Sequence, residues 1–163
     1  MSRYKFIRMV KYIKLYFAAP LFCDAEREFN EKITNQIERL GYEVFLPQRA
    51  NIDLDEKCSR EITNHEKSKF IFELDKKEMF SSDIFLFVLD GRIPDEGACV
   101  ALGMCYMHKS LVNNNKLLIG LQTDKRGAYK YSKLNPMIEA SMNCIFESVS
   151  ELLEFLKNKI ISE

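Results

Sequence analysis

Carboxylates surround one apolar run in the middle of the chain. Asp75 lies eight residues before Asp83, the apolar run covers 84–89, and Asp90 and Asp95 follow it closely. Carboxylates gathered where a parallel strand gives way to a helix are typical of active sites in open α/β proteins. Such groups can take up or deliver a proton, or attack an electrophilic carbon. The stretch therefore predicts a site for acid–base or nucleophilic chemistry.

Each of these residues also has a structural interpretation. Asp75 falls late in a predicted helix, where it is either a buried acid with a partner or part of a solvated helix face. Asp95 precedes the next helix, and its carboxylate can cap the free backbone amides there. Asp90 with Gly91 can form a turn after the strand, although its place at the strand end leaves a ligand role open. Gly97 can simply permit close packing of helix and sheet.

A second candidate segment follows the first predicted strand. Residues 16–22 read Tyr-Phe-Ala-Ala-Pro-Leu-Phe and lack the glycine-rich pattern of dinucleotide-binding loops. Small residues such as Ala18 let a ligand approach the backbone. Tyr16, Phe17 and Phe22 can stack on a flat ring or pack into the core. The composition of this loop favours a flat aromatic ligand over a phosphate.

Strand and helix patterns alternate along the chain, and they must position these residues. Strand patterns cover 12–19, 42–46, 84–89, 116–121 and 144–146, while helix patterns cover 24–40, 64–79, 95–109, 135–141 and the segment from Ser148 onward. Residues 48–59 and 122–134 are predicted to be polar loops.

This alternation predicts an α/β fold. We expect a doubly wound, flavodoxin-like, five-stranded parallel sheet with helices on both faces. The uniformly apolar run 84–89 is typical of a parallel strand that is buried on both faces. A strand order of 2-1-3-4-5 places a crevice between the first and third strands, at the ends that carry 16–22 and 90–97.

The composition is that of one soluble domain. The 163 residues are 47% hydrophobic and 29% charged, which predicts a single domain over 1–163 with a basic N-terminal lead over 1–12. Lys+Arg and Asp+Glu balance at 24 each, so the charge gives no support to nucleic-acid binding. No apolar run reaches the ~18 residues that cross a membrane. Five cysteines without a CxxC pair and two distant histidines predict reduced thiols, a cytoplasmic location and no metal site.

Taken together, these residues resemble the nucleoside 2-deoxyribosyltransferase family over about 14–146. The order and spacing of the matching pieces carry the resemblance more than any single piece. The pieces are 16–22 followed by Ala25-Glu26 and Phe29-Asn30, Asp75 eight residues before Asp83, Asp90-Gly91, Asp95-x-Gly97, Leu102-Gly103 and Asn135-Pro136-Met137-Ile138.

The resemblance implies an exchange of the base on a purine or pyrimidine 2′-deoxyribonucleoside. In that family a glutamate attacks the anomeric carbon, the base leaves, and a second free nucleobase takes the sugar from the covalent intermediate. This is a retaining double displacement through an oxocarbenium-like transition state. A neighbouring carboxylic acid must protonate the departing base nitrogen. The implied reaction needs no cofactor and no metal.

The resemblance also assigns roles to individual residues. Asp75 and Asp95 match the positions that handle the nucleobase and its proton, and Tyr16 matches a tyrosine that hydrogen-bonds the catalytic carboxylate. Asn135 and Met137 match residues that reach a neighbouring subunit's site and contact the sugar, which implies a homo-oligomer. The other expected substrate-binding residues are Phe17, Ala18, Phe22 (which matches a residue of the base pocket), Asp90, Gly91 and Gly97.

The sequence departs from the family's pattern at Ala101. The family places its nucleophilic glutamate six residues after the base-handling aspartate, and here Asp95 plus six is Ala101. A methyl group cannot attack the anomeric carbon, and loss of a nucleophile cost on the order of 10⁶ in rate in a protease. We therefore expect the chain to be nearly inactive. It is either an engineered Glu→Ala variant, which the intact surroundings favour, or a natural homologue that binds nucleosides without turnover.

Two other functions stay open at this point. Water in place of the second base gives an N-glycoside hydrolase that acts on nucleosides or nucleotides. A 5′-phosphate would call for a Ser-rich or basic cradle near the first strand, which 16–22 does not provide. The third candidate is a non-catalytic nucleoside-binding protein, and Ala101 supports it. Base preference and the choice between ribosyl and deoxyribosyl groups also stay open.

Overall fold

A five-stranded parallel sheet forms the centre of the molecule. The structure is a computed structural model that describes residues 12–50, 63–124 and 134–162. The sheet order is β2-β1-β3-β4-β5, and all of its pairings are parallel. The predicted fold and strand order are therefore confirmed. The strands are β1 (Lys14–Ala18), β2 (Glu43–Phe45), β3 (Ile84–Val88), β4 (Leu117–Leu121) and β5 (Cys144–Phe146).

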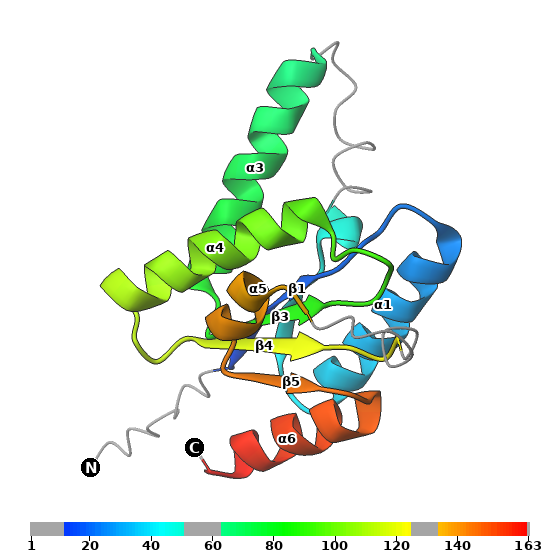
Figure 1. Ribbon diagram of the computed structural model, residues 1–163, viewed down its shortest axis with the longest axis vertical. Coiled ribbons are helices and arrows are strands. Elements are labelled where there is room, and N and C mark those ends of the chain that lie inside the picture. Colours follow the sequence, from blue (N-terminus) through cyan, green and yellow to red (C-terminus); the bar gives the residue numbers. More distant parts are fainter. Residues whose placement is uncertain (1–11, 51–62, 125–133, 163) are drawn as a thin grey trace, which may run out of the picture.

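Helices cover both faces of this sheet (Figure 1). One face carries α1 (Asp24–Arg39) and α6 (Val149–Ser162), and the other carries α3 (Asn64–Ser81), α4 (Glu96–Leu111) and the short α5 (Pro136–Ser141). Within the described parts of the chain, none of the helices combines the length and the hydrophobicity needed to span a membrane.

The hydrophobic core divides into two clusters, one on each face of the sheet. Leu15 and Phe17 of β1 pack with Ile33 of α1, whereas Tyr16 packs with Leu102 of α4. Successive side chains of a strand point to opposite faces of the sheet. Strand β1 therefore sends Tyr16 toward α3 and α4, and sends its two neighbours toward α1 and α6. All five residues of β3 are buried, as its apolar run predicts.

One predicted loop begins with a helical turn. Residues 47–50 are helical, whereas their polar composition predicted a loop over 48–59. Pro47 suits a helix start, because the N–H that it lacks would be unpaired there anyway. Arg49 holds the turn on α1 through ion pairs with Glu31 and Glu38, at 2.5 and 2.7 Å. The rest of that loop, the basic lead up to residue 11 and residues 125–133 of the second predicted loop lie outside the described residues.

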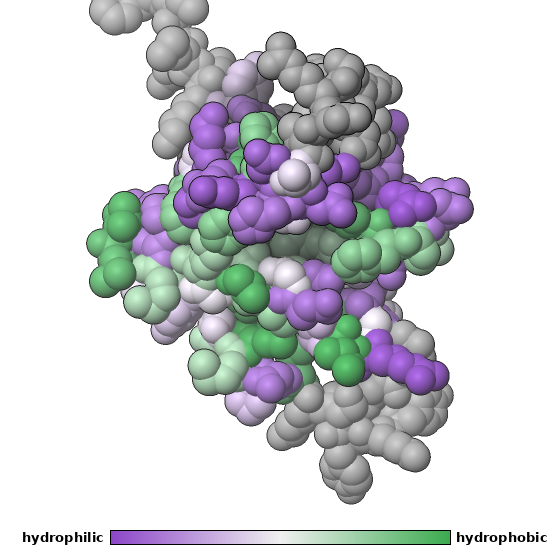
Figure 2. Space-filling view, turned by 90° about the horizontal axis from the view of Figure 1, so that it is seen from above, coloured by the Kyte–Doolittle hydropathy of each residue, from purple (hydrophilic) through white to green (hydrophobic). Residues whose placement is uncertain are grey.

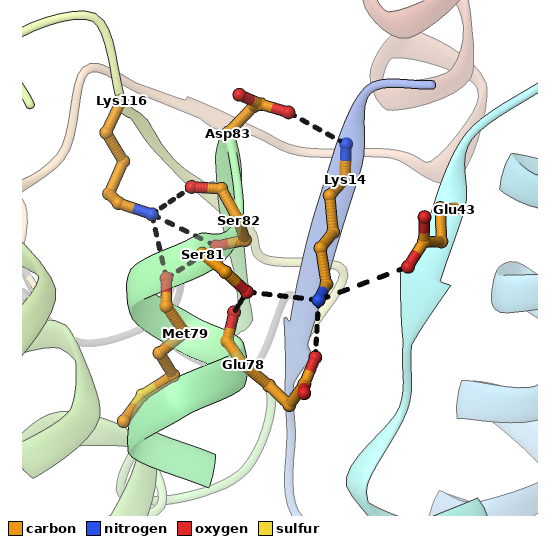
Figure 3. A network of polar contacts seen from close by, with 8 residues as sticks. All are labelled: Lys14, Glu43, Glu78, Met79, Ser81, Ser82, Asp83 and Lys116. Carbon is orange, nitrogen blue, oxygen red and sulfur yellow. Dashed lines mark hydrogen bonds and ion pairs between the residues drawn. The ribbon is translucent and has the colours of Figure 1, made fainter. Parts of the chain in front are cut away.

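Two lysines hold the C-terminal end of α3 against the sheet (Figure 3). Lys116 is fully buried, and its Nζ donates to the carbonyl of Met79 at 2.8 Å and to Oγ of Ser82 at 3.1 Å. It also donates to the carbonyl of Ser82. Lys14 Nζ donates to Oε2 of Glu78 at 2.5 Å. A cation beside the free carbonyls of a helix C-terminus is favourable, even though burial lowers the pKa of Lys116.

Replacing Lys116 by methionine is expected to lower the free energy of unfolding by about 2–4 kcal/mol, because the buried Ser82 carbonyl would lose its ammonium donor. Urea unfolding followed by circular dichroism measures the change. Lys157 is exposed on α6, and the control Lys157→Met is expected to stay within about 0.5 kcal/mol of the parent chain. Equal losses in both variants would show that Lys116 does not anchor α3.

Candidate active site

A cavity of about 490 Å³ opens between α3, α4 and the loop after β1. It lies at the carboxyl end of β1, where the strand order places a crevice, and its volume is in the range of small-molecule sites. Its polar lining side chains are Tyr16, Ser68, Asp75 and Asp95. The other lining residues are Ala18, Ala19, Leu21, Pro47, Ile71, Phe72, Met79, Gly97, Ala98, Val100, Ala101 and Met104. In the described part of the chain, no three His, Cys, Asp or Glu residues cluster to hold a metal ion.

Asp75 projects from α3 into this cavity. Burial raises the pKa of its carboxyl to about 6, a hydrogen bond from the Tyr16 hydroxyl opposes that rise, and the negative charge of Glu78 adds to it. Of the two interpretations of Asp75, the structure supports a partly buried acid with a partner. A carboxyl group that titrates near pH 6 can carry a proton and release it near neutrality, as a general acid must.

Tyr16 is held rigidly beside Asp75. Its ring is stacked between those of Phe45 and Phe85, with centroid separations of 5.5 and 5.7 Å. Burial raises the pKa of the Tyr16 hydroxyl well above its usual range, and the charge of Asp75 raises it further. The hydroxyl therefore keeps its proton and donates to the carboxyl group.

Helix α4 brings Asp95 and Ala101 to the same cavity. Asp95 is the N-cap, and its Oδ2 accepts a hydrogen bond from the backbone N–H of Ala98 at 2.7 Å. Capping and a place in the cavity wall therefore coexist at Asp95. Ala101 lies further along the helix and also lines the cavity. Glu96 is exposed and outside the lining set, which makes it a poor substitute for a nucleophile.

The structure thus brings together Tyr16, Ala18, Asp75, Asp95, Gly97 and Ala101. Phe17 lies in the core on the opposite face of the sheet, so only its backbone could face a ligand. Phe22 is 73% exposed and lies outside the cavity lining. The predicted binding roles of these two phenylalanines remain predictions.

Asp90 is occupied by contacts within the protein. Its Oδ1 accepts from the backbone N–H groups of Thr123 and Asp124 at 2.6 and 2.8 Å, and its Oδ2 accepts from the Thr123 hydroxyl at 2.5 Å. Asp90 therefore joins the segments after β3 and β4. The next residue, Gly91, has a φ of 120°, which favours glycine and fits the predicted turn. Neither residue lines the cavity.

Asn135 and Met137 lie away from the cavity on α5. Oδ1 of Asn135 caps the helix by accepting from the backbone N–H of Met137 at 2.9 Å. Met137 is 79% exposed. Asn135 is exposed as well, so both residues lie at the surface of the chain.

Several lining residues were not predicted, although helical spacing contains the signal. Ser68, Phe72 and Met79 lie seven, three and four residues from Asp75, which places them on one side of α3. Met104 lies three residues after Ala101, on the same side of α4. Once Asp75 and Ala101 are chosen, the 3.6-residue period finds these neighbours.

The fold is that of an α/β protein with a carboxylate-lined cavity as its candidate site, and comparison with known proteins gives its family. The nucleoside 2-deoxyribosyltransferase family model matches residues 15–150. The chain therefore belongs to the nucleoside 2-deoxyribosyltransferase family. A search of curated proteins finds no match.

Solved structures share the fold at low sequence identity. A conserved protein from Enterococcus faecalis V583 is 23% identical with a TM-score of 0.70, over 91% of this chain and 99% of that one. A 2-deoxyribosyltransferase from Bacillus psychrosaccharolyticus is 21% identical with a TM-score of 0.69, over 86% and 90%. A CMP N-glycosidase from Clostridium botulinum is 17% identical with a TM-score of 0.54, over 90% and 98%.

The raised pKa of Asp75 predicts a pH-dependent stability. The carboxyl titrates near 3.8 when unperturbed and near 6 in the folded chain, so folding favours the protonated form. That contribution is fully present below about pH 4 and is lost as the pH rises through about 6. Asp75→Asn is therefore expected to raise the free energy of unfolding at about pH 8 by up to about 2 kcal/mol, and to leave it unchanged at about pH 4.

Urea unfolding at the two pH values measures this difference. Glu28 is an exposed acid on α1, and Glu28→Gln serves as the matched control, for which no such difference is expected. An Asp75→Asn effect of the same size at both pH values would contradict the raised pKa of the carboxyl.

Proposed function

We propose that the cavity binds 2′-deoxyribonucleosides and that its chemistry is transfer of the 2-deoxyribosyl group between nucleobases. The observation that carries this proposal is the Asp75–Tyr16 pair, a proton-carrying carboxyl in a mostly apolar cavity that Asp95 and Ala101 also line. Family membership supplies the class of reaction. Apolar walls with a few convergent polar groups suit a flat base joined to a polar sugar.

In the proposed mechanism, protonated Asp75 gives its proton to a ring nitrogen of the departing base. A carboxylate at position 101 attacks C1′ as the bond to the base breaks, which leaves the sugar as a glycosyl ester. The incoming base then displaces the carboxylate and loses its proton to Asp75, so the configuration at C1′ is retained. Tyr16 holds the carboxyl of Asp75, and Asp95 contacts the base.

Ala101 supplies no nucleophile for the first step. Whatever its origin, an alanine at this position leaves the groups that handle the base and the proton in place and removes the attacking carboxylate. We therefore propose that this chain binds nucleosides and turns them over very slowly.

The substitution Ala101→Glu is expected to raise the rate of base exchange by several orders of magnitude, up to about 10⁶. The assay uses deoxyinosine or thymidine as donor and adenine as acceptor, with chromatographic measurement of the new nucleoside and of free sugar. Ala101→Gln has a similar size without a nucleophilic carboxylate, and it is expected to stay as slow as the parent chain.

The products separate the candidate functions. New nucleoside that forms only with Ala101→Glu supports the transferase. Free sugar that forms at the same rate with and without acceptor shows an N-glycoside hydrolase instead. Binding of deoxyinosine without turnover by all three proteins would leave a nucleoside-binding protein and would reject the catalytic roles.

We also propose that a neighbouring subunit completes the site through Asn135 and Met137. The exposure of Met137 supports this, since its side chain is free to reach another molecule. Figure 2 shows hydrophobic side chains exposed among hydrophilic ones on the face seen from above. On α4, Val100, Met107 and Leu111 are exposed as well. Exposed apolar side chains that gather on one face can mark a subunit interface.

Subunit complementation tests this arrangement. In the Ala101→Glu background, Met137→Ala is expected to raise KM about tenfold, in keeping with the loss of one apolar contact. Co-assembly with subunits that carry Ala101→Glu and Asp75→Asn, which are themselves inactive but keep Met137, is expected to restore a low KM. Glu139→Gln, an exposed change on the same helix, is the control. A KM that stays high in the mixed oligomer would place Met137 outside the neighbour's site.

A further inference from the structure

Lys14 and Glu78 form a charge pair between β1 and α3 (Figure 3), and Glu78 lies three residues after Asp75 along the helix. Lys14 Nζ and Glu78 Oε2 are 2.5 Å apart, and the side chains are only 21% and 14% exposed. The same ammonium group donates to the hydroxyl of Ser81 at 3.0 Å and lies 4.0 Å from a carboxylate oxygen of Glu43. This pair is more enclosed than the ion pairs of a solvated surface, which contribute little.

The backbone of Lys14 is fixed as well. Its N–H donates to Oδ2 of Asp83 at 2.9 Å, and the N–H of Asp83 donates to the carbonyl of Lys14 at 2.8 Å. Asp83, which precedes β3, therefore fixes the backbone of Lys14, while Glu78 and Ser81 hold its ammonium group. A charge held in one place exerts a constant field on its surroundings.

Strand β1 and helix α3 carry both the Lys14–Glu78 pair and the Tyr16–Asp75 contact. Lys14 and Tyr16 are two residues apart on β1, so their side chains point to the same face. Asp75 and Glu78 are three residues apart on α3, so they are neighbours on the helix surface. The result is two polar contacts side by side between β1 and α3, Tyr16 with Asp75 and Lys14 with Glu78.

We propose that Lys14 and Glu78 are positioning residues that act as a pair to control the protonation of Asp75. The effect on Asp75 itself is independent of the reaction. Its consequence for the pH at which the site works rests on the proposed function.

The charged and titratable groups around Asp75 come from three elements. Tyr16 faces it from β1, Glu78 is its neighbour on α3, and Asp95 lines the same cavity at the start of α4. Of the other charged residues next to Asp75 on α3, Lys76 and Glu73 pair with each other at 2.5 Å, and Lys77 is exposed. Glu78 is the one whose negative charge raises the pKa of Asp75, and it also raises the pKa of Tyr16.

The two members of the pair carry opposite charges, so we expect their removal to move the titration of Asp75 in opposite directions. Without the charge of Lys14, the negative charge of Glu78 is no longer opposed, and Asp75 holds its proton to a higher pH. Without the charge of Glu78, the positive charge of Lys14 remains alone, and Asp75 loses its proton at a lower pH. A role in stability alone would not produce shifts of opposite sign.

Carboxyl-group NMR titration of the full chain measures this directly. Lys14→Gln is expected to raise the titration midpoint of Asp75, and Glu78→Gln to lower it, each by about one pH unit. Lys14→Arg keeps the charge and is expected to keep the midpoint. Lys77 is exposed on the same helix, and Lys77→Gln is the matched control for loss of a lysine charge, with no shift expected.

Midpoints that stay the same, or that shift in the same direction in both variants, would overturn the proposal. If Lys14→Gln does not fold, Glu78→Gln decides alone, because its amide oxygen can still accept from Lys14. In the Ala101→Glu background, the pH profile of base exchange is expected to move with the midpoint. A midpoint that moves while the rate profile does not would keep this inference and would reject Asp75 as the proton donor of the proposed function.

Discussion

The position of β1 between β2 and β3 is the constraint on which the site depends. Because α1 connects β1 to β2 over one face of the sheet and α3 connects β2 to β3 over the other, the two helices lie on opposite sides of β1. That divergence creates the space that the cavity occupies. The register that places Tyr16 beside Phe85 decides what lines it. A shift of one residue would turn Tyr16 toward α1 and bring Phe17 to the cavity instead.

The cavity contains a carboxyl group, that of Asp75, whose burial in the charged form is unfavourable. Partial burial of the Asp75 carboxyl disfavours its charged form, and the Tyr16 hydroxyl compensates only in part. Helix α3, which carries Asp75, is held at its C-terminal end by Lys14 and Lys116, whose ammonium groups bind the last turn. Functional sites commonly keep such a perturbed acid at some cost to stability. Here the anchoring contacts are at the C-terminal end of α3, and Asp75 lies about one turn before them.

Regular elements and spacing were predictable from sequence, and long-range side-chain contacts were not. The apolar strands and alternating helices determine the sheet, and the intervals between Asp75, Asp95 and Ala101 place all three on the cavity. Lys116 could not be recognised as buried, since its acceptors on Met79 and Ser82 lie 37 and 34 residues earlier in the chain. The exposure of Phe22 likewise depends on contacts from α1 side chains that fix the loop backbone. The carboxylate of Asp90 is occupied by a segment after another strand.

Helix α3 extends well beyond the rest of the molecule (Figure 1), and Met79 is the one residue along it that is buried in the described structure. Ile71 and Phe72, nearer its free end, form part of the cavity wall, and Phe72 is 47% exposed. A ligand bound in this cavity would cover these side chains and supply apolar contact to this half of the helix. Local opening of the first turns of α3 is then less favourable in the complex than in the free protein. Such a ligand would take the place of core side chains against α3. Its measured affinity would therefore include the free energy of ordering the first turns of that helix.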